Sequence, residues 1–118
     1  MWVDHLRSHE AELDELLDGG LVVMHPFVVG EIACGNMADR ASILELLCAL
    51  PSAVVADDDE VFGFIESHGL HGKGVGWVDV HLLASAKLTQ GVTLWTRDRN
   101  LQAAAELLGL AYRHATSH

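Results

Sequence analysis

Cysteine and long apolar runs are both scarce in this chain of 118 residues. The 2 cysteines, Cys34 and Cys48, are too few for a disulfide framework and lack the Cys-x-x-Cys spacing of a zinc site. The longest apolar runs, such as Leu21 to Met24, fall far below the roughly 20 residues of a membrane span. The N-terminus shows no signal-peptide pattern. We therefore expect a soluble cytoplasmic protein with no membrane segment.

Basic residues are also scarce. The chain has 7 Lys and Arg against 17 Asp and Glu, which gives a formal net charge of −10. Such a balance by itself disfavours nucleic acid as a partner, since phosphate binding depends on Lys and Arg. It is compatible with a basic protein partner. It is also compatible with nucleic-acid chemistry if acidic residues hold a divalent cation, because the ion reverses the local field.

The pattern of apolar residues and turn signals predicts one α/β domain over residues 1–118. Apolar Leu21–Met24 is typical of a strand buried in a parallel sheet, and Pro26 suits the first turn of the next helix. Asp57 and Glu60 have the spacing of a capping box. Helices are expected over 2–7, 10–18, 26–36, 39–50, 57–67, from the glycine loop at 74–76 to about 88, and 100–108. Strands are expected over 21–24, 54–55, 91–96 and 110–112.

Two acidic residues are expected on apolar helix faces. Asp79 follows the Gly74-Val75-Gly76 loop, and the helical spacing places Leu82, Leu83 and Ala86 on its side. Glu31 shares a face with Phe27, Val28 and Cys34 by the same spacing. A desolvated carboxylate must be neutralised, hydrogen-bonded or bound to a cation. Helix-dipole stabilisation or capping is the simpler alternative for Asp79.

A third acidic residue, Asp98, comes just after the expected strand at residues 91–96, where open α/β sheets place their ligands. Its alternative role is the N-cap of the next helix. If Asp98, Asp79 and Glu31 converge at one rim, their mutual repulsion requires a cation. Carboxylate oxygens suit Mg²⁺ or Mn²⁺, which complete their shells with water and substrate phosphate. Hydrolysis of a phosphodiester is the reaction class that follows.

Basic and hydroxyl side chains near these acids are candidates for holding a nucleic-acid backbone. Thr96, Arg97 and Arg99 flank Asp98, and Lys73 precedes the glycine loop. Ordinary solvated side chains are the alternative for each. The triple Asp57-Asp58-Asp59 is better explained by helix capping than by a metal site, and the eight histidines, His81 among them, are expected to be surface or packing residues.

Four stretches, in this order, make the chain resemble the PIN-domain ribonucleases and, within them, the VapC-like toxins of type II toxin–antitoxin modules. They are Trp2-Val3-Asp4-His5-Leu6-Arg7, His25-Pro26-Phe27-Val28-Val29-Gly30-Glu31-Ile32, Gly74-Val75-Gly76-Trp77-Val78-Asp79-Val80-His81-Leu82-Leu83 and Leu94-Trp95-Thr96-Arg97-Asp98. The resemblance implies a three-layer α/β/α sandwich with a mainly parallel sheet and Mg²⁺- or Mn²⁺-dependent cleavage of RNA. It also implies a homodimer and an inhibitory antitoxin. Glu31, Asp79 and Asp98 match three acidic site residues of the family.

The family's fourth acid, an Asp at the end of its first strand, has no counterpart here. Asp4 lies past that strand and cannot replace it, so the chain is expected to lack the family's first strand. A misplaced start is one explanation; a truncated remnant that mainly binds its antitoxin is the other. A receiver-like phosphotransfer domain is disfavoured, because no lone acceptor Asp follows an apolar strand with a later partner Lys.

Overall fold

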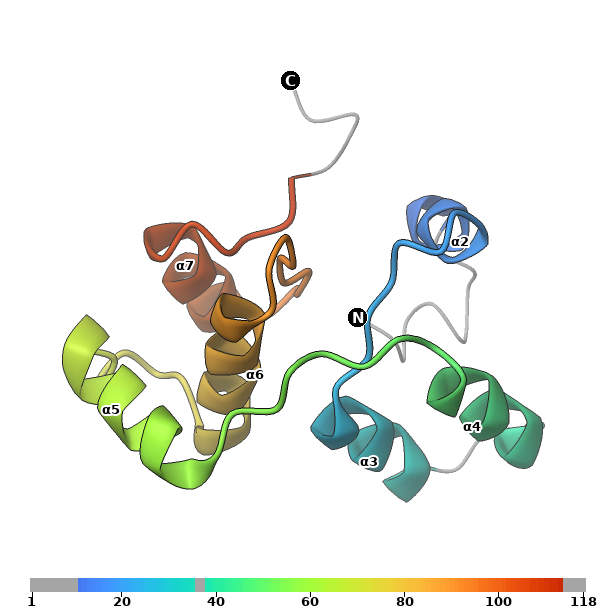
Figure 1. Ribbon diagram of the computed structural model, residues 1–118, viewed down its shortest axis with the longest axis horizontal. Coiled ribbons are helices and arrows are strands. Elements are labelled where there is room, and N and C mark those ends of the chain that lie inside the picture. Colours follow the sequence, from blue (N-terminus) through green and yellow to red (C-terminus); the bar gives the residue numbers. More distant parts are fainter. Residues whose placement is uncertain (1–10, 36–37, 114–118) are drawn as a thin grey trace. The chain divides into compact units, whose positions relative to one another are not determined.

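The structure is a computed structural model that describes residues 11–35 and 38–113. The helices of this part of the chain are α2 (Ala11–Asp18), α3 (Pro26–Cys34), α4 (Arg40–Cys48), α5 (Asp58–His68), α6 (Trp77–Leu88) and α7 (Arg99–Leu107), drawn in Figure 1. They fall into two compact units, Met1–Ala53 and Val54–His118, which are described separately. We call them unit 1 and unit 2. The expected helix at 2–7, with Asp4, lies outside the described residues.

Unit 1 contains α2, α3 and α4, each close to its predicted bounds. Helix α2 ends at Asp18, and Gly19 and Gly20 follow it. Gly20 has a φ of 69°, a left-handed conformation that glycine adopts readily. Pro26 is the first residue of α3, as predicted, and the Nδ1 atom of His25 accepts a hydrogen bond from the Phe27 amide at 3.0 Å. The Arg40 guanidinium donates to the Ala33 carbonyl at 2.6 Å, which ties the end of α3 to the start of α4.

The core of unit 1 is small. Its buried residues are Met24, Ile32 and Leu47, and partly buried aliphatic side chains surround them. Leu46 of α4 does not contribute to this core, since it is 69% exposed. Leu46 directly precedes buried Leu47, so about 100° of helical rotation carries it away from the core face.

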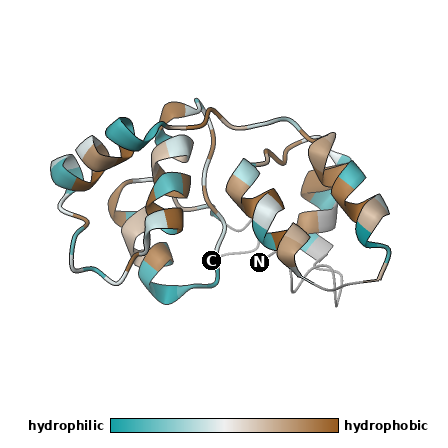
Figure 2. Ribbon diagram, turned by 90° about the horizontal axis from the view of Figure 1, so that it is seen from below, coloured by the Kyte–Doolittle hydropathy of each residue, from teal (hydrophilic) through white to brown (hydrophobic). Residues whose placement is uncertain are grey.

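Unit 2 is built from α5, α6 and α7. Asp57 and Glu60 form the predicted capping box, with each side chain accepting a hydrogen bond from the other residue's amide. Helix α6 contributes Val80 and Leu83 to a large core cluster, and Figure 2 shows hydrophobic and hydrophilic stretches along the helical ribbons. Phe62 of α5 stays outside this core, because it is 57% exposed and its ring centroid lies 5.0 Å from that of Trp77.

The predicted strands are reduced to two single parallel bridges within the described residues. One joins Met24 to Ser52 in unit 1, and the other joins Leu94 to Ala111 in unit 2. Their parallel direction agrees with the prediction, but no extended strand forms in the described ranges, and residues 54–55 make no bridge. A β ladder requires partners on neighbouring segments, so a short apolar run pairs only where such a segment lies alongside it.

No helix in the described part of the chain is long and apolar enough to cross a bilayer.

Candidate active site

Asp98 is the N-cap of α7. Its Oδ1 atom accepts a hydrogen bond from the Leu101 amide at 2.9 Å, and its own amide donates to the Thr96 hydroxyl at 3.1 Å. The capping role considered from the sequence is therefore confirmed. A carboxylate offers about four lone-pair positions on two oxygens, so one capping bond leaves acceptor capacity for a cation. Asp98 is exposed, which allows a ligand to reach it.

Asp79 lies in the first turn of α6, where a negative charge is favoured by the helix dipole. Gly76 is the N-cap of this helix and supplies no capping side chain. The Asp79 side chain is half-buried, between the exposed Val78 and the buried Val80. The sequence placed this carboxylate along an apolar stripe, and its partial burial agrees with that placement.

The starts of α6 and α7 are linked by a contact between their flanking segments. The Asn100 side-chain Nδ2 donates to the Gly74 carbonyl at 3.4 Å. Asn100 lies two residues after Asp98, and Gly74 lies two residues before the N-cap of the helix that carries Asp79. Unit 2 thus brings together the segments that lead to two of the three predicted carboxylates.

Glu31 lies in α3 of unit 1, and its side chain is exposed. The expectation that an apolar helix face desolvates the Glu31 carboxylate is wrong, because Glu31 is exposed together with Cys34, although Phe27 and Val28 are half-buried. In neither unit do the described residues bring three or more His, Cys, Asp or Glu side chains together as a metal-binding group. The three-carboxylate site therefore stays a prediction.

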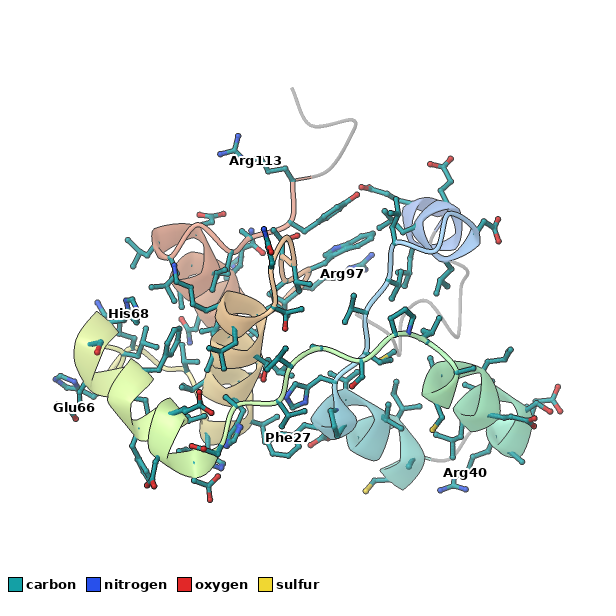
Figure 3. The ribbon with its side chains drawn as sticks, in the orientation of Figure 1. Phe27, Arg40, Glu66, His68, Arg97 and Arg113 are labelled. Carbon is teal, nitrogen blue, oxygen red and sulfur yellow. The ribbon has the colours of Figure 1, made fainter. Side chains whose placement is uncertain are left out.

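The candidate substrate-binding residues surround Asp98. Thr96 is half-buried and accepts the hydrogen bond from the Asp98 amide, whereas Arg97 and Arg99 are exposed on either side of that residue. Figure 3 shows Arg97 on the segment that precedes α7. Lys73, in the loop before α6, is also exposed. These positions leave two guanidinium groups accessible beside an acidic residue.

His81 is a buried core residue. Its sequence context predicted either a surface position or a packing role, and the packing role is the one observed. It is 2% exposed, and its Nε2 atom lies 3.3 Å from the Asp58 carboxylate at the start of α5. The Trp77 ring meets the imidazole edge-on at 4.7 Å. The helical spacing could have indicated that His81 is buried. It follows Trp77 by four residues and precedes buried Ser85 by four, which places all three on one helix face.

The sequence profile of the PIN domain matches residues 1–107 of this chain. The chain belongs to the PIN-domain family. Over 117 residues it is 39% identical to Ribonuclease VapC32 of Mycobacterium tuberculosis, both in strain CDC 1551 / Oshkosh and in strain ATCC 25618 / H37Rv. Each alignment covers 99% of this chain and 94% of the relative. No solved structure matches the chain.

These comparisons confirm the VapC-like PIN resemblance predicted from the sequence motifs. A PIN domain implies an α/β fold. In the described residues, β pairing is limited to the two isolated parallel bridges, so the expected central sheet stays a prediction.

Proposed function

We propose that this PIN-domain protein is a metal-dependent endoribonuclease that acts as the toxin of a type II toxin–antitoxin module. The observation that carries the proposal is its 39% identity, over 99% of the chain, to a protein named Ribonuclease VapC32. The positions of Asp79 and Asp98 support it, since both carboxylates lie at helix starts within unit 2. The domain would extend over residues 1–118 as one three-layer sandwich.

Glu31, Asp79 and Asp98 are the residues that would hold Mg²⁺ or Mn²⁺. Their fit rests on the donor set: all three are carboxylates, the hard oxygen ligands that these ions prefer. Asp98 retains an oxygen beyond its capping bond, and Asp79 is only half-buried. When bound, such an ion polarises a phosphodiester and lowers the pKa of a coordinated water.

The surrounding side chains would position the RNA backbone. Arg97 and Arg99 are exposed cations beside Asp98 and would pair with phosphate oxygens that carry no sequence information. Thr96 would act indirectly, because its hydroxyl holds the Asp98 amide. Loss of these contacts would weaken RNA binding in a salt-dependent manner.

An antitoxin and a second copy of the chain are the proposed protein partners. Exposed aromatic residues support a role for unit 2 in such contacts, since Phe62 is 57% and Trp77 is 41% exposed and the two rings touch. Aromatic side chains are enriched in protein interfaces. Helix α5, which contains Phe62, also has Asp58, Asp59 and Glu60 in its first turn, and these acidic residues suit a partner with basic residues.

The test is RNA cleavage by the full chain and by the Asp79→Asn variant, with Mg²⁺ or Mn²⁺ and with EDTA. Asn keeps the size of the side chain but removes the charge that a metal ligand needs. We expect at least about a 100-fold loss of cleavage, beyond the 10-fold to 100-fold typical of residues that only support a ligand. Asp59→Asn, an exposed carboxylate on α5, is the matched control and should keep full activity.

Equal cleavage by the wild type and Asp79→Asn would contradict this assignment. A wild-type chain without metal-stimulated cleavage that still binds its antitoxin would instead identify the binding remnant considered from the sequence.

A further inference from the structure

We propose that Asn100 is a positioning residue for the carboxylate site, because it holds the loop before α6 against the first turn of α7. The inference rests on the proposed function and assigns a role to a residue outside the predicted set. Asn100 would act through the Gly74 segment on Asp79, and through its own helix on Asp98.

The contact combines a long hydrogen bond with close packing of the Asn100 side chain against the backbone of Gly74. The Asn100 Nδ2 atom donates to the Gly74 carbonyl at 3.4 Å. A Cβ atom added to Gly74 would lie 2.5 Å from Nδ2 and 3.0 Å from Cγ of Asn100. Gly74 has a φ of 74°, which a residue with a side chain rarely adopts. A side chain at position 74 would therefore adopt a strained backbone conformation and would displace the exposed Asn100 side chain from its present position.

The contact joins the loop before α6, the helix that contains Asp79, to the first turn of α7, the helix that Asp98 caps. From Gly74 the chain reaches the N-cap Gly76 in two residues and Asp79 in three more, and the Val80 amide bonds the Gly76 carbonyl at 2.9 Å. On the other side, Asn100 is followed by Leu101, whose amide is held by the Asp98 carboxylate. Under the proposal, a displacement at Gly74 would shift the Gly76 carbonyl and loosen its hydrogen bond with the Val80 amide in the first turn of α6.

Asn100 contributes little to the core of unit 2. Its side chain is exposed, whereas the next residue, Leu101, is 4% exposed and packs in the core. Replacing Asn100 therefore separates a positioning effect from a general loss of stability. Substitution of an exposed residue changes stability only slightly when it removes no buried contact.

Gly72 provides a matched control for Gly74. Its φ of 73° is almost the same and it lies in the same loop, but a Cβ atom there would meet nothing within 4 Å. Gly72→Ala and Gly74→Ala therefore share the cost of the left-handed backbone. Only Gly74→Ala also forces the Asn100 side chain to move.

The experiment compares Asn100→Ala, Gly74→Ala, Gly72→Ala, Asp79→Asn and the double variant Gly74→Ala/Asn100→Ala in the full chain. Mn²⁺ affinity is measured by electron paramagnetic resonance, and hydrogen exchange is measured at the Val80 amide. For Asn100→Ala we expect about 10-fold weaker Mn²⁺ binding, as for residues that orient metal ligands. Exchange at Val80 should rise about 2-fold to 10-fold, the factor produced by one lost hydrogen bond.

Gly74→Ala should weaken Mn²⁺ binding more than Gly72→Ala does. The double variant should recover part of that loss, because the atoms that collide with the new Cβ are gone. Unchanged Mn²⁺ affinity or unchanged Val80 exchange in Asn100→Ala would overturn the positioning role, even where Asp79→Asn abolishes binding. Equal Mn²⁺ binding by the wild type and Asp79→Asn would overturn the metal site itself, and the proposed function with it.

Discussion

The two units of this protein differ in how much apolar surface they bury. Unit 2 contains a cluster from α5, α6 and α7 in which Val61, Leu83 and Ala105 are each 0% exposed. Among the described residues of unit 1, the core cluster contains Met24, Ile32 and Leu47, at 4% to 5% exposed, and Leu13 is buried outside that cluster. Since hydrophobic stabilisation scales with the apolar area removed from water, unit 2 is expected to hold most of the stability. Two of the three candidate carboxylates lie in that better-packed unit.

Leucine truncation in each core gives the largest expected effects. Leu83→Ala should lower the free energy of unfolding by about 3–5 kcal/mol, because it opens a cavity in a fully buried cluster. Leu47→Ala should cost about 2–3 kcal/mol, since a small core can collapse around the lost atoms. Urea denaturation of both variants measures the difference.

Leu107→Ala controls for the substitution itself, since Leu107 is 74% exposed and should change stability by less than about 0.5 kcal/mol. If Leu47→Ala lowered the free energy of unfolding as much as Leu83→Ala does, the proposed difference between the two cores would be wrong.

Ser85→Ala tests the hydrogen bond that links α6 to Ala56, near the start of unit 2. The Ser85 hydroxyl is 1% exposed and accepts the hydrogen bond of the buried Ala56 amide at 3.2 Å. Removing it leaves that amide without this bond, at an expected cost of about 1–3 kcal/mol. Thermal unfolding checks the value, and Ser67→Ala, an exposed serine on α5, should leave the melting temperature unchanged. A Ser85→Ala variant as stable as Ser67→Ala would show that the bond adds nothing.

Asp57→Ala gives the smallest effect. Its carboxylate accepts the Glu60 amide hydrogen bond at 2.8 Å as half of the capping box, so the variant should lose about 1 kcal/mol. Circular dichroism during denaturation follows the change. Asp59→Ala, in the same helical turn but outside the cap, is the control. A loss in Asp59→Ala equal to that in Asp57→Ala would point to charge and not to capping.

Helix positions were predictable from the sequence because their signals are local. Gly19-Gly20, Pro26 and the Asp57–Glu60 box each act within one turn, and the helices begin or end beside them. Strands were not predictable to the same degree. Met24 pairs with Ser52 and Leu94 pairs with Ala111 through contacts between residues distant in sequence, which no local pattern specifies.

Side-chain environments in the site were predicted unevenly. The cap at Asp98 followed from its place before a helix, and the partial burial of Asp79 followed from helical spacing. Glu31 is exposed although its neighbours are apolar, because a one-dimensional pattern does not say which helix faces find a partner. The Asn100–Gly74 contact joins residues 26 positions apart and had no sequence signal beyond the glycine.

The placement of the two cysteines makes unit 1 accessible to chemical labelling. Cys34 and Cys48, the only thiols in the chain, are both exposed and unpaired, and both belong to helices of unit 1. A maleimide dye therefore marks unit 1 alone, without mutagenesis, and its fluorescence reports on that unit while the carboxylates of unit 2 are varied. The same exposure leaves both thiols open to disulfide formation between molecules in air, so a reducing agent belongs in every buffer used to count subunits.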